Sequence, residues 1–171
     1  FCVEQYVMLF SRMYKLGYTI FRYPNVYGPR QSPDGEAGVC SILAGKMLAG
    51  ETPTLYGHGK AFRDYVYVSD IAAANLLALE KGNHQTMNLG SGKPVSVKEL
   101  YDIIAELTGF SGKPVLKPLR PGEIQGIYIS GSVAATELVW KPKVDLKEGL
   151  MRTVSFIREQ QAHASCKDAV Q

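Results

Sequence analysis

Two arginines stand beside turns in this chain, and both side chains could bind phosphate. Arg63 in "GHGKAFRDYVYVSD" separates a glycine-rich turn from an apolar strand pattern, and Arg120 in "LRPGE" precedes the Pro121 and Gly122 turn. A guanidinium group presents several N–H donors in one plane and can bind a phosphate through two of them at once. The alternative is plain solvation at the surface, where Arg63 would pair with its neighbour Asp64.

An amide and an aromatic ring are further candidates for ligand contacts. Asn25 lies in "RYPNVYGPR", residues 22–30, where its side chain could hydrogen-bond either a ligand or the backbone of the loop. Tyr56 in "TLYGHG" could stack on a nucleobase, although a strand tyrosine more often packs in or beside a core. Both alternatives stay open for each residue considered alone.

Other reactive residue types show no spacing that is typical of a catalytic or metal site. "NLGSG" at residues 88–92 lacks the spacing of a phosphate-binding P-loop. The histidines have no partners at triad or metal-ligand spacing, and the cysteines are odd in number and far apart. These residues are His58, His84, His163, Cys2, Cys40 and Cys166. We therefore predict no metal site and no disulfide framework.

Length and composition indicate a globular protein of one domain, or of one domain with a fragment. The 171 residues include 46% hydrophobic and 20% charged residues, enough to bury a core. The net charge of +3 is spread without a basic block, so nucleic acid is not an expected partner. No membrane-spanning stretch or cleavable leader is visible, and we expect a cytoplasmic protein. Because Phe1 already lies in a helical pattern, we expect a segment upstream to be missing.

Helix and strand patterns alternate along the chain, which predicts the α/β class. The clearest helix is "SVKELYDIIAELTG", where Ser96 and Glu99 have capping-box spacing and Gly109 ends the segment. Further helices are expected from about residue 3 to a stop at Gly17, over 38–49, after a cap at Ser69 or Asp70, over 133–139, and from Leu146 to Gln161 after a cap at Asp145. Strands are expected at 18–23, 54–57, 62–68, within 86–92 and at 127–129.

These elements place the first candidate residues at the edge of a sheet. Residues 22–30 straddle the carboxyl end of the strand at 18–23, and in open α/β sheets ligands usually bind at that edge. A loop is expected over residues 32–38, and the polar tail from His163 onward is expected to fray.

In this order the motifs resemble the carboxyl-terminal half of the extended short-chain dehydrogenase/reductases of the NAD-dependent epimerase/dehydratase family. The resemblance rests on "FRYPNVYGPRQSPDGEAG", "YGHGKAFRDYVYVSDIAAA", "NLGSGKPVSVKEL", "RPGE" and "LVWKPKVDLKEGL", within about residues 20–150. It implies a Rossmann-like α/β fold whose Gly-rich cofactor loop and Tyr-x-x-x-Lys pair lie upstream of this chain. Residues 1–34 would be a remnant of the dinucleotide-binding domain, 35–162 mainly the substrate-binding domain with an interleaved sheet strand, and 163–171 a tail.

The same resemblance implies roles for individual residues. The backbone of Tyr23 and Pro24 would lie close to the nicotinamide of NAD, and Asn25 would bond the diphosphate region of a sugar nucleotide. Arg63 and Arg120 would bind that diphosphate together, which fits the chemistry of their side chains. The other implied contacts are uracil stacking by Tyr56, backbone contacts to uridine from Val39 and its loop, and a ribose contact from Glu123. No catalytic residue is expected in the chain, because the general base and the lysine beside the nicotinamide would lie upstream.

The activity that the resemblance implies is an NAD-dependent interconversion of UDP-glucose and UDP-galactose through a 4-keto intermediate. NAD would be bound mainly by the missing amino-terminal domain, the substrate would be a UDP-sugar, and the parent protein would be a homodimer without nucleic-acid or membrane partners. Two alternatives stay open: a nucleotide-sugar 4,6-dehydratase or decarboxylase of the same family, and a non-catalytic nucleotide-sugar-binding module if the chain is complete.

Overall fold

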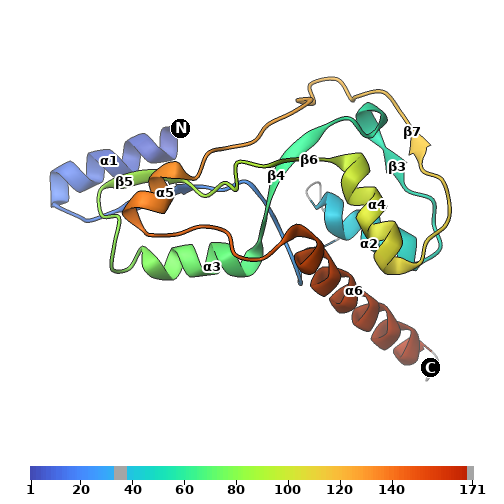
Figure 1. Cartoon of the computed structure of the whole chain (residues 1–171). Coiled ribbons are helices and arrows are strands. Elements are labelled where there is room, and N and C mark those ends of the chain that lie inside the picture. The colour runs from blue at the N-terminus through green and yellow to red at the C-terminus, as the bar shows by residue number, and fades with distance from the viewer. Residues whose placement is uncertain (33–37, 169–171) are drawn as a thin grey trace.

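The computed structural model describes residues 1–32 and 38–168, with the backbone alone for 164–168. Its helices are α1 (Cys2–Tyr14), α2 (Val39–Leu48), α3 (Val68–Leu77), α4 (Val97–Thr108), α5 (Ser132–Glu137) and α6 (Leu146–Asp168), with a 3₁₀ turn at Tyr56–Gly59. Its strands are β1 (Thr19–Arg22), β2 (Asn25–Tyr27), β3 (Thr54–Leu55), β4 (Phe62–Tyr67), β5 (Gln85–Asn88), β6 (Pro94–Ser96) and β7 (Val115–Leu116). The predicted α/β class is confirmed (Figure 1).

The strands form three small sheets, and β4 is the central strand of the largest. In that sheet β4 pairs with β2 in parallel and with β6 in antiparallel orientation. β1 pairs with β5 in parallel, and β3 pairs with β7 in parallel. Because β1 leads after two residues into β2, the chain passes from one sheet to the next within "RYPN" (Figure 1). Asn25 is therefore the first residue of a second strand, which the sequence patterns did not predict.

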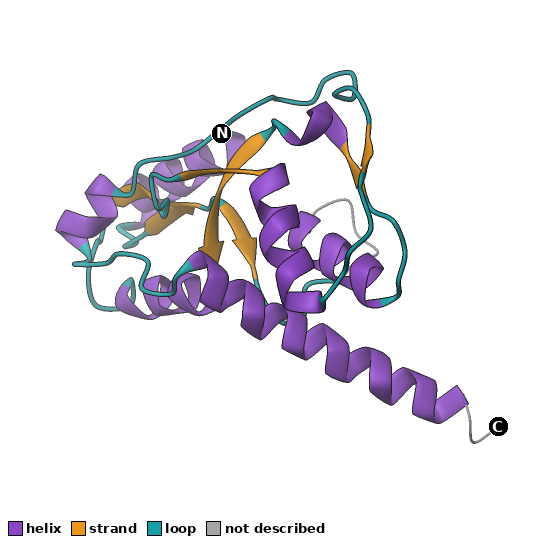
Figure 2. Cartoon of the chain, turned by 45° about the vertical axis from the view of Figure 1, so that its right-hand side comes forward, coloured by secondary structure: helices purple, strands orange, loops and turns teal. Residues whose placement is uncertain are grey.

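The helices lie around the small sheets (Figure 2), and two hydrophobic clusters hold these layers together. The first lies where α2, α4 and α6 pack beside the sheet of β2, β4 and β6, with Leu43, Leu100 and Ile104 fully buried. The second joins β1 and β5 to α3 and α5, and its largest member is Trp140. The expected division into a dinucleotide-binding remnant over 1–34 and a substrate-binding part over 35–162 stays a prediction, and the second cluster includes residues from both ranges.

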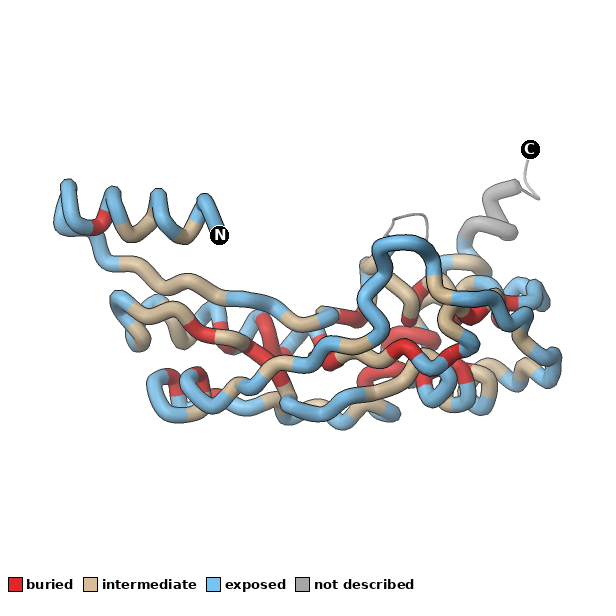
Figure 3. The backbone as a smooth tube through the Cα atoms, turned by 90° about the horizontal axis from the view of Figure 1, so that it is seen from above, coloured by how far each residue is buried: buried red, intermediate tan, exposed pale blue. Residues whose placement is uncertain are grey.

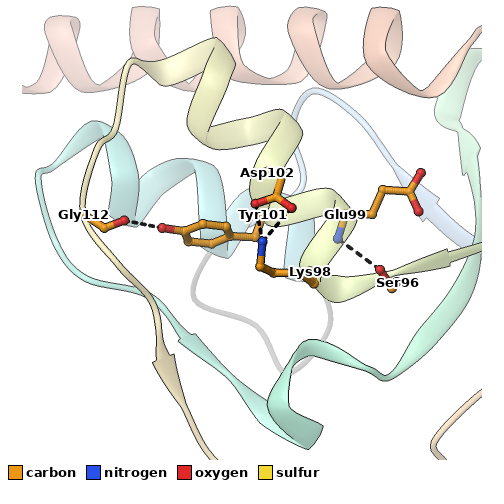
Figure 4. A network of polar contacts seen from close by, with 6 residues as sticks. All are labelled: Ser96, Lys98, Glu99, Tyr101, Asp102 and Gly112. Atoms are coloured by element: carbon orange, nitrogen blue, oxygen red, sulfur yellow. Dashed lines mark hydrogen bonds and ion pairs between the residues drawn. The ribbon is translucent and has the colours of Figure 1, made fainter.

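Local capping signals of α4 are confirmed. The Ser96 hydroxyl accepts a hydrogen bond from the Glu99 N–H at 3.0 Å, and Gly109 ends the helix in the left-handed region with φ of 75° (Figure 4). The Tyr101 hydroxyl donates to the Gly112 carbonyl and ties the helix to the segment that follows it (Figure 4). These contacts fix one wall of the first cluster.

Other helix boundaries differ from the sequence predictions. The left-handed residue after α1 is Lys15 (φ of 58°), whereas Gly17 instead lets the chain approach Asn83, whose Oδ1 accepts a hydrogen bond from the Tyr18 N–H. The prediction that Ser69 or Asp70 caps the third helix is wrong, because α3 already begins at Val68. Asp70 is buried, and its Oδ2 accepts the N–H groups of the segment before α6, at residues 143 and 144.

The strand predicted at 127–129 and the helix end predicted at Gln161 are also wrong. Only Gly126 forms a bridge, with Phe62, and the "IYI" segment runs alongside without a ladder of its own. α6 continues to Asp168, so most of the predicted tail is helical. Most of the loop predicted at 32–38 and the last three residues of the tail lie outside the described residues.

Helix α1 stands off from the rest of the molecule (Figure 3). Its exposed surface is largely apolar. Ser11 is its one buried residue, and the Arg22 guanidinium bonds both Glu4 carboxylate oxygens, at 2.6 and 2.7 Å. That hydrogen bonding lowers the pKa of Glu4. Exposed apolar side chains run along the helix: Val3, Tyr6, Leu9, Phe10, Met13 and Tyr14.

Candidate functional site

A small cavity opens where the chain passes from β1 to β2. Its volume is about 190 Å³, and its lining includes Tyr23, Pro24 and Asn25 from this crossing, Asp64 from β4, and the segment 127–129. The sequence predicted the first three as ligand contacts. It did not predict that the "IYI" segment would form the opposite wall, because that pairing joins residues about a hundred positions apart.

The side chains of Tyr23 and Asn25 differ in what they leave available. The Tyr23 hydroxyl donates to Asn75 Oδ1 on α3 at 3.1 Å, so this side chain is engaged and a ligand would meet the backbone of residues 23 and 24. Asn25 is exposed, and its amide has no hydrogen-bond partner among the described residues. A free amide at the rim of a cavity can donate to a phosphate oxygen or accept from a sugar hydroxyl.

Arg63 does not form the surface pair with Asp64 that was the alternative to phosphate binding. Its guanidinium donates to three backbone carbonyls: Ile124 at 2.7 Å, Phe62 at 2.8 Å and Gln125 at 3.4 Å. The backbone of the same segment also bonds β4, through the Phe62 N–H to the Gln125 carbonyl at 3.0 Å. Arg63 thus ties the segment that carries Arg120 to the central strand, and its remaining donors can reach an anion.

Asp64 is buried, with 2% of its surface exposed, and its carboxylate joins two loops. It accepts the Ser91 hydroxyl at 2.6 Å and the Gly92 N–H at 3.1 Å on one side, and the Ile129 N–H at 3.3 Å on the other. The Ser91 N–H bonds both of its oxygens, at 3.0 and 3.1 Å. A charged residue inside an apolar strand pattern is the sequence signal for such a buried junction, but the sequence analysis considered Asp64 only as a possible surface partner of Arg63.

Tyr56 and Arg120 lie against each other, which sequence reasoning did not predict. The Arg120 guanidinium carbon lies 3.9 Å from the centroid of the Tyr56 ring, within the range of a cation–π contact. The two segments are also joined by the His58 N–H, which bonds the Lys117 carbonyl at 3.0 Å. The residue predicted to stack on uracil and one predicted to bind the diphosphate therefore share one corner of the molecule.

Glu123 closes the turn that presents Arg120. One of its carboxylate oxygens accepts the Arg120 N–H at 3.1 Å, and its own N–H donates to the Arg120 carbonyl at 3.1 Å. The other carboxylate oxygen has no hydrogen-bond or ion-pair partner among the described residues. The predicted ribose contact is compatible with this arrangement, since a carboxylate can accept hydroxyl donors while it holds a turn.

Val39 begins α2, so its N–H belongs to the first turn, where amides have no partner within the helix. That position suits the predicted backbone contact to a nucleoside. Beside it, burial raises the pKa of the Cys40 thiol to about 12, which keeps this thiol protonated. Cys40 is therefore part of the core and not a nucleophile.

The described residues contain neither a metal-binding cluster nor a membrane-spanning helix. No group of three or more histidine, cysteine or acidic residues is arranged to hold a metal ion in residues 1–32 and 38–168. Over the same part of the chain, no helix combines the length and the apolar character that crossing a membrane requires.

Comparisons with known proteins identify relatives of this chain. The sequence model of the NAD dependent epimerase/dehydratase family matches residues 1–90. A putative UDP-glucose 4-epimerase of Methanocaldococcus jannaschii is 47% identical over 91% of this chain and 50% of its own length. A UDP-glucose 4-epimerase of Mycolicibacterium smegmatis is 37% identical over 92% of this chain and 50% of its own.

Two similar solved structures also carry the name UDP-glucose 4-epimerase. The UDP-glucose 4-epimerase of Thermotoga maritima, crystallised with UDP-glucose, superposes with a TM-score of 0.90 at 46% identity over 92% of this chain and 51% of that one. A UDP-glucose 4-epimerase of Thermus thermophilus in complex with NAD gives a TM-score of 0.82 at 37% identity over 91% of this chain and 51% of that one. The chain spans about half the length of the relatives that it matches. With this sequence identity and this fold, the chain belongs to the NAD-dependent epimerase/dehydratase family.

Proposed function

We propose that the chain is the carboxyl-terminal, sugar-nucleotide-binding part of an NAD-dependent epimerase that interconverts UDP-glucose and UDP-galactose. The observation that carries the proposal is the corner where Arg120 covers the ring of Tyr56 and the following segment is held to β4 by Arg63. A cation and an aromatic ring suit a ligand that joins a diphosphate to a flat base. Relatives at 47% and 37% identity that carry the name UDP-glucose 4-epimerase support the choice of sugar nucleotide.

Each residue has a part in this proposal. Arg120 and the free donors of Arg63 neutralise the diphosphate, Tyr56 stacks on uracil, and Asn25 bonds the diphosphate region from the cavity rim. Glu123 accepts from the ribose, and the first-turn amide of Val39 contacts the uridine. These contacts orient the sugar, which would leave its C4 position beside the backbone of residues 23 and 24.

The chain offers only part of a cofactor site. A cavity of about 190 Å³ beside Tyr23 and Pro24 fits one end of a dinucleotide, the nicotinamide ring, and not the whole molecule. We propose that the rest of NAD is held by residues outside this chain, which carries no Gly-rich dinucleotide loop. When bound, NAD supplies the acceptance and return of a hydride at the sugar, and the residues named above supply binding and orientation.

The test is calorimetric titration of the chain with UDP. Arg120→Ala should weaken UDP binding about ten- to a hundredfold, the value of a charge-assisted hydrogen bond of roughly 1.5 to 3 kcal/mol. The UDP affinity of Arg120→Lys should lie between those of wild type and Arg120→Ala, because lysine keeps the charge but cannot stack a planar group on Tyr56. Lys81→Ala, which changes an exposed lysine away from the site, is the matched control. Equal UDP affinity in wild type and Arg120→Ala would refute the assignment of this corner.

Titration with other nucleotides separates the alternatives within the family. A relative at 32% identity carries the name UDP-N-acetyl-alpha-D-glucosaminuronate decarboxylase, so the sugar and the reaction can differ while UDP remains. UDP-glucose and UDP-galactose should each bind more tightly than UDP alone if the sugar is as proposed. Tighter binding of a UDP-uronic acid than of both hexose nucleotides would favour the decarboxylase alternative.

A further inference from the structure

The ring of Tyr56 is covered by a side chain of the same molecule. The Arg120 guanidinium carbon lies 3.9 Å from the centroid of the ring, which is van der Waals contact and leaves no room for another flat group between them. Tyr56 is half-buried, whereas Arg120 is exposed. A base that stacks on the covered face of Tyr56 must therefore take the place of the guanidinium.

The Tyr56 ring is also the contact that positions the guanidinium. Among the described residues, the Arg120 side chain forms no ion pair and donates no hydrogen bond. The backbone of Arg120 is fixed, because its N–H donates to a Glu123 carboxylate oxygen and its carbonyl accepts the Glu123 N–H, at 3.1 Å each. The side chain can leave the ring while the turn that carries it stays in place.

Contacts on both sides of this turn keep Arg120 close to the ring. Before the turn, the His58 N–H bonds the Lys117 carbonyl at 3.0 Å. After it, the Arg63 guanidinium bonds the Ile124 carbonyl at 2.7 Å. The segment between β7 and α5 runs along the outside of the molecule between these anchors and α5 (Figure 1). The guanidinium can therefore lie on the ring or on an anion beside the ring.

The corner formed by Tyr56 and Arg120 is separate from the cavities of the molecule. Neither residue lines the cavity of about 190 Å³ beside Tyr23, and neither lines a larger cavity of about 600 Å³ between the loops 90–93 and 140–146. A ligand meets the ring at the surface, where the guanidinium already lies. The guanidinium is therefore the group that a base has to displace to reach this face.

Displacement of the guanidinium affects a nucleoside and a nucleoside diphosphate differently. A cation–π contact at an exposed site changes an equilibrium constant by about two- to fivefold. Uridine breaks this contact and offers the guanidinium no new partner, so its affinity is reduced by that factor. UDP offers phosphate oxygens, whose charge-assisted hydrogen bonds are stronger than the contact that is lost.

We propose that Arg120 is a specificity-determining residue that shields Tyr56 from bases that carry no diphosphate. In the free protein the guanidinium covers the ring. When a nucleoside diphosphate binds, the guanidinium moves to the phosphates and uracil stacks on the face that it leaves. This inference rests on the proposed function, since it takes Tyr56 as the contact to uracil and Arg120 as a contact to the diphosphate.

The variant Arg120→Ala tests the proposal, because it should change two affinities in opposite directions. Calorimetry should show UDP binding weakened about ten- to a hundredfold, as the proposed function requires. Titration followed by NMR should show uridine bound about two- to fivefold more tightly than by wild type. Lys60→Ala is the matched control, because it removes an exposed cation beside the turn that carries Tyr56, and it should leave uridine affinity unchanged.

Inorganic pyrophosphate provides a second test without a change of sequence. Saturating pyrophosphate should draw the guanidinium off the ring of the wild type and tighten uridine binding about two- to fivefold. The same addition should not alter uridine affinity in Arg120→Ala. In a Tyr56→Leu background, Arg120→Ala should no longer tighten uridine binding, because the face that it uncovers is missing.

The results separate this inference from the proposed function. Weaker UDP binding by Arg120→Ala together with unchanged or weaker uridine binding would overturn the inference, because the base then binds without displacing the guanidinium, and the proposed function would stand. Unchanged affinity of Arg120→Ala for both UDP and uridine would refute both.

Discussion

Replacement of Asp64 by alanine should destabilise the chain more than any surface acid can. The carboxylate is 2% exposed and accepts the N–H groups of Ser91, Gly92 and Ile129 together with the Ser91 hydroxyl. Alanine leaves three backbone N–H groups without an acceptor, and each buried one costs roughly 1 to 3 kcal/mol unless water reaches it. The cavities on both sides admit water to part of this junction. We therefore expect a loss of about 3 to 5 kcal/mol.

Asp64→Asn should destabilise the chain less than Asp64→Ala does. The hydrogen-bond partners of the two carboxylate oxygens determine the orientation of the asparagine amide. If its nitrogen took the Oδ2 position, it would face the N–H groups of Gly92 and Ile129, donor against donor. At the Oδ1 position it faces the Ser91 hydroxyl, which can rotate and accept, and it gives up only one of the two bonds of the Ser91 N–H, which keeps its bond to Oδ2. Three N–H bonds then change from a charged to a neutral acceptor, at about 1 kcal/mol each, and relief from burying a charge offsets part of this. We expect a loss of about 2 kcal/mol.

Urea unfolding followed by circular dichroism measures both variants, with the slope compared to confirm that the same surface unfolds. Asp102→Ala is the matched control, because the Asp102 side chain is 56% exposed and its one ion pair among the described residues is with Lys98 on the same helix. This variant should cost less than about 0.5 kcal/mol. A loss below about 1 kcal/mol in Asp64→Ala, or equal losses in Asp64→Ala and Asp102→Ala, would refute the reasoning.

Three further predictions concern the core and the exposed helix. Iodoacetamide at pH 8.5 should label the exposed Cys2 and leave Cys40 unlabelled until denaturant is added, because burial raises the pKa of the Cys40 thiol to about 12; peptide mapping that finds native Cys40 labelled would contradict this. Gly149→Ala should lower the free energy of unfolding by about 1 to 3 kcal/mol despite alanine's better helix propensity, because its Cβ would lie 2.2 Å from the Tyr27 hydroxyl oxygen. Adding Tyr27→Phe should restore part of this loss, and urea unfolding measures both variants. The chain should self-associate at about tens of micromolar through the apolar surface of α1. Light scattering should show a shift toward monomer when Tyr6 and Met13, which are 64% and 60% exposed, are both changed to glutamate. A monomeric wild-type chain at that concentration would count against this prediction.

The sequence correctly predicted those features that depend only on neighbouring residues. Ser96 and Gly109 bound α4 as predicted, because the cap and the left-handed stop depend on a few neighbouring residues. "IYI" has the composition of a strand, yet beside β4 it makes only the Ile127 N–H bond to the Phe62 carbonyl at 3.2 Å and no regular ladder among the described residues. A pattern of apolar residues carries no information about such pairing. Asn25 begins β2 for the same reason, since a strand of three residues is defined by its pairing with β4.

The site could be predicted by residue type but not by contact. Arg63 and Arg120 were identified from turns and charge, whereas their actual partners, the carbonyls of 124 and 125 and the ring of Tyr56, lie about sixty positions away in the chain. The resemblance to a known family implied the ligand classes but not these contacts.

The alternation of side chains along β4 explains why one strand serves both cavities. Successive side chains of a strand point to opposite faces, so Arg63 and Asp64 act on different neighbours. Arg63 holds the segment that carries Arg120, and Asp64 holds the Ser91 loop on one side and Ile129 on the other. The next residue, Tyr65, lines a second cavity of about 600 Å³ together with the Ser91 loop. A displacement of the Ser91 loop would therefore reach Ile129 in the smaller cavity through the Asp64 carboxylate, and Asp64→Asn should weaken this coupling.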